Sequence, residues 1–110
     1  KCSGAMQTIL RAEGNRLYCP GPDSTSFESR AYGTERAAMD ALLTILQVHT
    51  GRPLTRPTVG LHIYSADPAM NLGCHFLILA VTDRGASVYA ASLSDLARHN
   101  LIPPQEAPTC

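Results

Sequence analysis

This sequence has no tryptophan, only one lysine, Lys1, and few aromatic side chains, which make up 5% of its 110 residues. The longest uninterrupted apolar run, Phe76 to Val81, is far shorter than the roughly 20 residues that a membrane-spanning helix requires. The formal charge sums to zero, so the chain as a whole exerts no electrostatic attraction on nucleic acid or on an anionic membrane. We therefore expect no membrane association, and any charged binding surface must be local.

Close cysteine pairs of the C-x-x-C type, which zinc and redox sites use, are also missing. The cysteines lie far apart, at Cys2, Cys19, Cys74 and Cys110. An even number, with one cysteine near each end, suits an oxidising compartment, and we expect the pairs Cys2–Cys110 and Cys19–Cys74. The alternative is a cytosolic protein with reduced, partly buried thiols.

The length of the chain suits one domain with a modest hydrophobic core, so we expect a single domain over residues 1–110. The sequence begins without methionine, as a mature secreted protein would, although a trimmed chain would look the same. We expect a secreted monomer.

The first half of the chain predicts a β-hairpin followed by one substantial helix. Residues 5–11 indicate a strand or a short helix, Glu13-Gly14-Asn15 a turn, and residues 16–19 a second strand. Residues 20–26 are rich in proline and small polar side chains and indicate a loop. Thr34 to His49 has a capping threonine, an apolar stripe at helical spacing and a terminating glycine after it.

The second half predicts strands. Residues 59–64 indicate one strand, residues 65–73 a loop, and residues 74–92 an antiparallel hairpin with a turn at Asp83-Arg84-Gly85. Because Phe76 to Val81 is continuously apolar, we expect this strand to be covered on both faces. Ser94 to Asn100 indicates a helical turn capped by Ser94, and the tail is proline-rich and extended. The predicted fold class is α+β, with one main helix packed on an antiparallel sheet in a disulfide-linked domain.

Two histidines on predicted strands, His62 and His75, are the first candidate catalytic residues. If they met across neighbouring strands, they would form an acid/base pair suited to cleaving phosphodiesters. No carboxylate lies beside either of them in the sequence, which favours ordinary sheet residues. Glu35 and Asp67 are interpreted as a helix-start residue and a turn residue, so we expect neither a metal nor a cofactor.

The segment Cys2-Ser3-Gly4 resembles the D-C-S-G nucleophile motif of NlpC/P60-like cysteine peptidases, and His62 and His75 follow in the order that such enzymes use. This resemblance implies a hydrolase in which Cys2 is the nucleophile and His62 its base. The sequence departs from the motif because Lys1 replaces the preceding aspartate.

The order of the whole chain resembles the RNase T1/F1-like fold, including the RNase-like secreted effectors of plant-pathogenic fungi. The likeness rests on an N-terminal cysteine, an opening hairpin, the helix at Thr34 to Met39, the late hairpin at Phe76 to Ser92 and a C-terminal cysteine. Guanyl-specific ribonucleases of that fold use a glutamate, an arginine and a histidine on the sheet.

Here the corresponding positions offer His62, His75 and a hairpin that ends at Ser92-Leu93. The resemblance therefore implies a pseudoenzyme with no catalytic residues, because a fold does not by itself specify a function. Its expected role is that of a virulence effector that binds a host protein or RNA, outside or inside a host cell. The alternative is an active hydrolase, either a peptidase using Cys2 and His62 or a ribonuclease using His62 and His75.

Overall fold

The main helix, α1 (Glu35–Thr50), begins and ends where its capping residues predict. The Thr34 hydroxyl accepts a hydrogen bond from the Ala37 N–H at 3.0 Å, which satisfies one of the free donors of the first turn. Gly51 ends the helix in a left-handed conformation, with φ of 73°, and its N–H donates to the Gln47 carbonyl. The computed structural model describes residues 6–22, 26–70 and 74–104.

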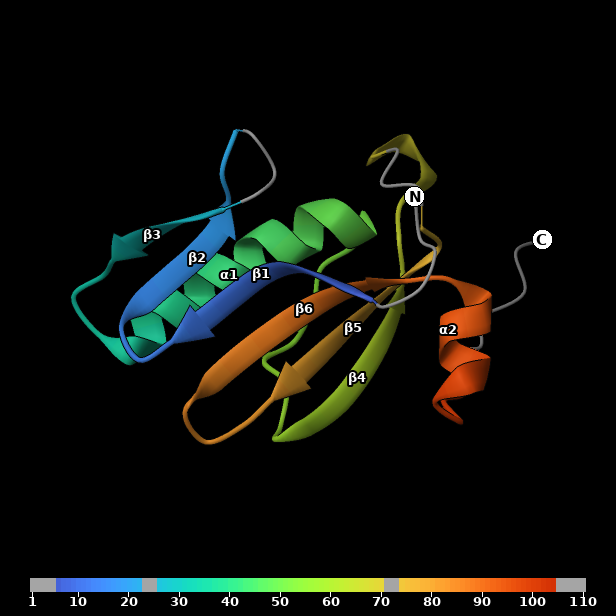
Figure 1. Cartoon of the computed structure of the whole chain (residues 1–110). Coiled ribbons are helices and arrows are strands. Elements are labelled where there is room, and N and C mark those ends of the chain that lie inside the picture. The colour runs from blue at the N-terminus through green and yellow to red at the C-terminus, as the bar shows by residue number, and fades with distance from the viewer. Residues whose placement is uncertain (1–5, 23–25, 71–73, 105–110) are drawn as a thin grey trace.

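A six-stranded antiparallel sheet forms the rest of this α+β domain, with the order β3-β2-β1-β6-β5-β4. Figure 1 shows α1 lying across one face of this sheet. The strands are β1 (Gln7–Glu13), β2 (Arg16–Pro20), β3 (Phe27–Ala31), β4 (Gly60–Ser65), β5 (Phe76–Val81) and β6 (Gly85–Ala91). A short 3-10 helix, η1 (Pro68–Met70), and a second α-helix, α2 (Leu93–Arg98), complete the described elements.

Both predicted hairpins are confirmed, and the structure joins them side by side. The first is β1 with β2, the second β5 with β6, and β1 pairs antiparallel with β6. Gly85 lies at the contact between them, where an added Cβ would come 1.9 Å from the Ala12 carbonyl oxygen. A side chain at this position would force β1 away from β6.

Strand β3 was not predicted from the sequence. All five of its residues are exposed, so no buried side chain marks one of its faces. The strand forms because its backbone pairs with β2, from Arg16 opposite Ala31 to Pro20 opposite Phe27. Backbone pairing with β2 therefore stabilises β3, although its hydrophobic pattern does not indicate a strand.

The main core lies between α1 and the sheet face that α1 covers, called here the α1 face. Leu42 and Leu46 of α1 are fully buried against Leu77 and Leu79 of β5 and Val88 of β6. Because side chains alternate along a strand, the residues between these point to the opposite side, called here the α2 face.

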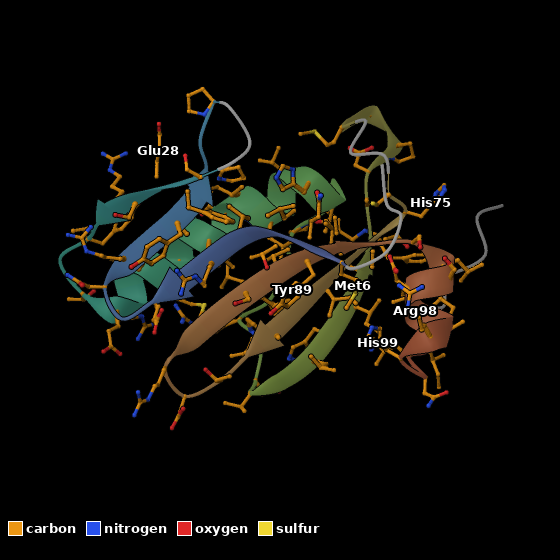
Figure 2. The ribbon with its side chains drawn as sticks, in the orientation of Figure 1. Met6, Glu28, His75, Tyr89, Arg98 and His99 are labelled. Atoms are coloured by element: carbon orange, nitrogen blue, oxygen red, sulfur yellow. The ribbon has the colours of Figure 1, made fainter. Side chains whose placement is uncertain are left out.

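A smaller core lies on the α2 face, where α2 packs over one end of the sheet. Ile78 of β5, Ala91 of β6 and Leu96 of α2 are buried there together. Strand β5 is therefore covered on its α1 face and, around Ile78, on its α2 face, whereas Ala80 on the α2 face is only half-buried, so the predicted cover on both faces is confirmed for part of the strand. Met6 and Tyr89 border this second core, as Figure 2 shows.

The cap of α2 differs from the prediction. Ser92, rather than Ser94, is the N-cap, and it forms a capping box with Asp95: the Ser92 hydroxyl accepts from the Asp95 N–H, and the Asp95 carboxylate accepts from the Ser92 N–H at 2.9 Å. The helix therefore starts earlier than the sequence indicated. Among the described residues, no helix is long and apolar enough to cross a membrane.

Candidate functional site

A row of polar side chains crosses the uncovered part of the α2 face. Ser29 of β3 pairs with Tyr18 of β2, Tyr18 with Arg11 of β1, and Arg11 with Ser87 of β6. Tyr89 lies two residues along β6 on the same face. We call the surface that contains this row, together with Arg16 and Arg84, the Arg–Tyr surface.

Local contacts hold the basic side chains of the Arg–Tyr surface. The Arg11 guanidinium lies over the Tyr18 ring, 4.2 Å from its centre, and donates to the Glu13 carboxylate at 2.6 Å. Arg16 donates to the Ser29 hydroxyl at 2.9 Å. Arg84 has no ion-pair partner in the described parts of the chain. With Asp83, which precedes Arg84 in the exposed turn, three guanidinium groups face two carboxylates here, so this part of an otherwise neutral protein keeps an excess of positive charge.

A shallow hollow of about 330 Å³ lies over β1, β5 and β6 within this surface. Arg11 and Glu13 line it on one side, Thr82 and Arg84 at one end, and Tyr89 at the other. Strand spacing and rise place Tyr18 and Tyr89 on the order of 12 Å apart, with Arg11 between the two strands that carry them. The surface thus offers two aromatic rings separated by positive charge.

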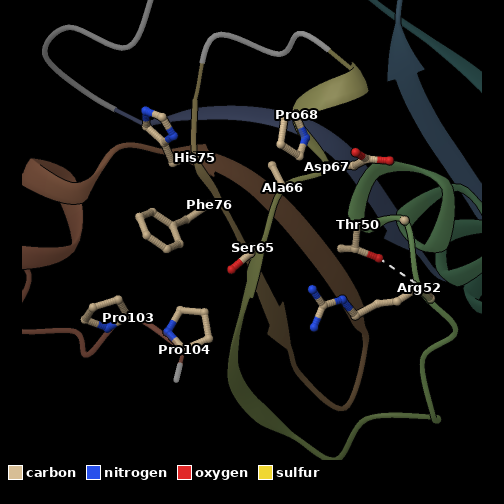
Figure 3. Close-up of a pocket in the computed structure, with 11 residues that line it drawn as sticks. Thr50, Arg52, Ser65, Ala66, Asp67, Pro68, His75, Phe76, Pro103 and Pro104 are labelled. Atoms are coloured by element: carbon tan, nitrogen blue, oxygen red, sulfur yellow. Dashed lines mark hydrogen bonds between the residues drawn. The ribbon is translucent and has the colours of Figure 1, made fainter. Parts of the chain in front are cut away.

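A second concave site lies at the end of α1, where β4 and β5 meet the C-terminal segment. Figure 3 shows this cleft, whose volume is about 610 Å³. Its lining combines polar side chains with apolar ones; the polar residues are Thr50, Arg52, Ser65, Asp67 and His75, and the apolar residues are Ala66, Pro68, Phe76, Pro103 and Pro104.

Two polar groups of the cleft are already engaged. The Thr50 hydroxyl donates towards the Gln47 and Arg52 carbonyl oxygens, and the Asp67 carboxylate accepts from the Ala69 N–H at 3.0 Å. The Arg52 side chain, in contrast, has no hydrogen-bond or ion-pair partner among the described residues.

The structure does not bring the two candidate catalytic histidines together. His62 pairs with Leu79, a position roughly 13 Å along the strand from His75 at ~3.4 Å per residue. The His62 ring contacts the Thr58 carbonyl oxygen at 2.7 Å, whereas His75 is exposed at the cleft. His62 and His75 are therefore too far apart in this structure to act as an acid/base pair.

The cysteine pairing needs correction. Cys19 is a free thiol, so the predicted Cys19–Cys74 bond is wrong. Cys74 is disulfide-bonded, and no disulfide joins two residues of the described ranges. Cys2 and Cys110, and with them the predicted bond between the ends and the peptidase nucleophile, lie outside the described residues.

Burial shifts the pKa of three side chains from its ordinary value. It raises the pKa of the Cys19 thiol, with a smaller contribution from the Glu28 carboxylate, and it raises the pKa of Tyr64. Cys19 is therefore held in the unreactive thiol form. Burial also lowers the pKa of His49, whose Nδ1 is buried without a partner, so this residue favours the neutral state.

Sequence reasoning placed His75 among the candidates but did not single out the residues of the Arg–Tyr surface. The signal that would have found them is the turn at Gly14, because a hairpin closed there sets Arg11 opposite Tyr18. Within residues 6–22, 26–70 and 74–104, no three His, Cys, Asp or Glu side chains form a metal-binding group. No protein-family model, curated protein or solved structure matches this chain.

Proposed function

We propose that this chain is a secreted, non-catalytic effector-type binding protein that binds single-stranded RNA on the Arg–Tyr surface. The observation that carries the proposal is the placement of Tyr18 and Tyr89 on one open sheet face, with Arg11 between them and Arg84 beside the hollow. Single-stranded nucleic acids bind to surfaces that combine aromatic stacking platforms with cationic groups along the backbone path.

Charge and shape favour RNA over a protein ligand at this surface. Guanidinium groups bind phosphate oxygens through paired hydrogen bonds, and a locally cationic patch on a neutral protein suits a polyanion. Apart from Arg11 and the two tyrosine rings, the row carries short polar side chains, Ser29 and Ser87, which leave the rings and the guanidinium groups accessible to an extended ligand.

A binding role fits the chemistry better than hydrolysis. His62 and His75 lie far apart, so the described residues do not assemble the acid/base pair that the ribonuclease alternative requires. The resemblance to RNase-like effectors supports the same proposal, because an opening hairpin, a main helix across a sheet and a late hairpin are the features on which that likeness rests.

Secretion is supported by the cysteines. Disulfides persist in oxidising compartments, and Cys74 is disulfide-bonded. Because Cys19 is free, the proposed partner of Cys74 is Cys2 or Cys110. Peptide mapping of the unreduced protein tests this pairing: a peptide that links Cys74 to either terminal cysteine is expected, and a bond between Cys19 and Cys74 would contradict it.

The proposed function is tested by fluorescence anisotropy with a labelled oligouridine at low salt. The Tyr18→Ala variant is expected to bind about tenfold more weakly, because base–aromatic stacking contributes about 1–3 kcal/mol per base. Tyr18→Phe keeps the ring and is expected to bind within about twofold of the unmodified protein. Arg30→Ala is the matched charge control, because Arg30 is exposed and pairs with Leu17, which places it on the α1 face, opposite the Arg–Tyr surface.

Four outcomes separate the alternatives. Equal binding of single-stranded and duplex RNA, or equal loss in the Arg30→Ala and Arg11→Ala variants, would contradict the proposed surface. Cleavage of the oligouridine that His62→Ala or His75→Ala abolishes would favour the ribonuclease alternative, and cleavage of a peptidoglycan peptide that Cys2→Ala abolishes would favour the peptidase.

A further inference from the structure

The cleft beside Arg52 has the chemistry of a second, independent ligand site. Its volume of about 610 Å³ lies within the range of small-molecule sites, which is roughly 300–1,000 Å³. Figure 3 shows the Arg52 guanidinium turned into the cleft towards Ser65, with the rings of Phe76, Pro103 and Pro104 on the other side. One cation and an apolar wall therefore face the same space.

The geometry points to a small aromatic carboxylate as the ligand of this cleft. The planar fork of Arg52 matches a carboxylate through two parallel hydrogen bonds, and it has no competing partner in the described parts of the chain. The ring of the ligand would pack against Phe76 and the two prolines, whose side chains carry no polar atoms. Ser65 supplies a hydroxyl between the two regions.

The Asp67 carboxylate limits the negative charge that a ligand of this cleft can carry. Its carboxylate lines the same cleft and is fixed by the hydrogen bond from the Ala69 N–H. The Arg52 and Asp67 charges cancel, so a bound monoanion leaves one uncompensated negative charge in the cleft, whereas a dianion such as phosphate leaves two. The site therefore selects a singly charged carboxylate with an apolar body over a compact phosphate.

Binding is measured by amide chemical-shift changes in the full protein, with benzoate as the probe. Benzyl alcohol serves as its uncharged analogue and inorganic phosphate as the compact anion. Benzoate is expected to shift the amides of Gly51, Ser65 and Phe76 and to leave those of Tyr18 and Tyr89 unchanged. Benzyl alcohol and phosphate are each expected to bind at least about tenfold more weakly, because each lacks one of the two matching features.

The Arg52→Gln variant is expected to keep the fold, because within residues 6–22, 26–70 and 74–104 the hydrogen bond at Arg52 uses its backbone carbonyl and not its side chain. It is expected to weaken benzoate binding about tenfold and to leave benzyl alcohol binding unchanged, while Arg52→Lys gives an intermediate loss. Arg36→Gln is the matched control and should leave benzoate binding unchanged. Equal benzoate binding in Arg52→Gln, phosphate binding as strong as benzoate binding, or shifts confined to the Arg–Tyr surface would each overturn the proposal.

Discussion

The two halves of the α2 face differ in what covers them. At the end of the sheet near α2, this face carries Ile78 of β5 and Ala91 of β6, which α2 buries with Leu96. Over β2, β1 and the rest of β6, the same face carries Tyr18, Arg11 and Ser87, and no described helix packs on them. One side of a single sheet is thus partly interior and partly open to a ligand, and the boundary follows the change from apolar to polar side chains.

The comparison predicts that core truncations on β5 destabilise the protein most. Leu79 is fully buried beneath α1, so Leu79→Ala is expected to lower the free energy of unfolding by about 2–5 kcal/mol. Urea denaturation measures this change. Ser87→Ala, on the open half, is the control and should change the stability by less than about 0.5 kcal/mol. Similar losses in the two variants would contradict the division into covered and open halves.

A smaller and more local loss of stability is expected when Leu96 of α2 is truncated. Leu96 is fully buried in the second core, but α2 has only six residues and can detach without unfolding the sheet. Leu96→Ala is expected to cost about 2 kcal/mol, at the low end for leucine truncation. Hydrogen exchange should accelerate in α2 while α1 stays protected. Equal acceleration in α1 would show that the two cores unfold together.

The capping box of α2 predicts a dependence on pH. The Ser92 N–H lowers the pKa of the buried Asp95 carboxyl, and the Ser92 hydroxyl and the Arg98 guanidinium act in the same direction. Because the folded pKa is depressed, the stabilisation is complete above the unfolded value, about pH 4, and is lost as pH falls through the folded pKa.

Asp95→Asn should therefore be less stable than the unmodified protein at neutral pH, and the difference should shrink in acid. Thermal unfolding followed across this pH range measures the effect. Asp83→Asn, an exposed turn residue, is the control and should retain the original pH profile. A constant difference between Asp95→Asn and the unmodified protein at every pH would refute the assignment.

The smallest predicted effect on stability comes from removing the charge of Glu13, on the open half. Glu13 is the carboxylate that pairs with Arg11, and both side chains are about half exposed. Glu13→Gln is expected to change stability by less than about 0.5 kcal/mol, since exposed ion pairs contribute little. It should strengthen oligouridine binding about threefold by removing a negative charge from the hollow. Unchanged or weaker binding would count against a phosphate ligand at Arg11.

Much of the fold could be predicted from local signals. Thr34 and Gly51 define the ends of α1, and the turns at Gly14 and Gly85 define the two hairpins. The exposed strand β3 could not be found, because its order comes from pairing with β2. The contact of β1 with β6 joins residues far apart in the chain, and no local pattern specifies such a contact.

The candidate sites were harder to predict for the same reason. Arg11 and Tyr18 become one surface only through hairpin register, and Tyr89 joins them only through the long-range pairing of β1 with β6. The pairing of Cys19 with Cys74 failed because sequence spacing does not specify which thiols approach one another. His75 was identified by residue type, but the cleft that it lines forms only because the fold brings Arg52 and Pro104, which are distant in sequence, close to it.

The most direct test of the central claim is an amide chemical-shift map recorded while single-stranded oligouridine is added to the full protein. The account predicts changes concentrated at Arg11, Tyr18, Ser87 and Tyr89, with the exposed face of α1 unaffected. Changes centred on α1 or on α2, or no saturable changes at low salt, would contradict RNA binding on the open half of the α2 face.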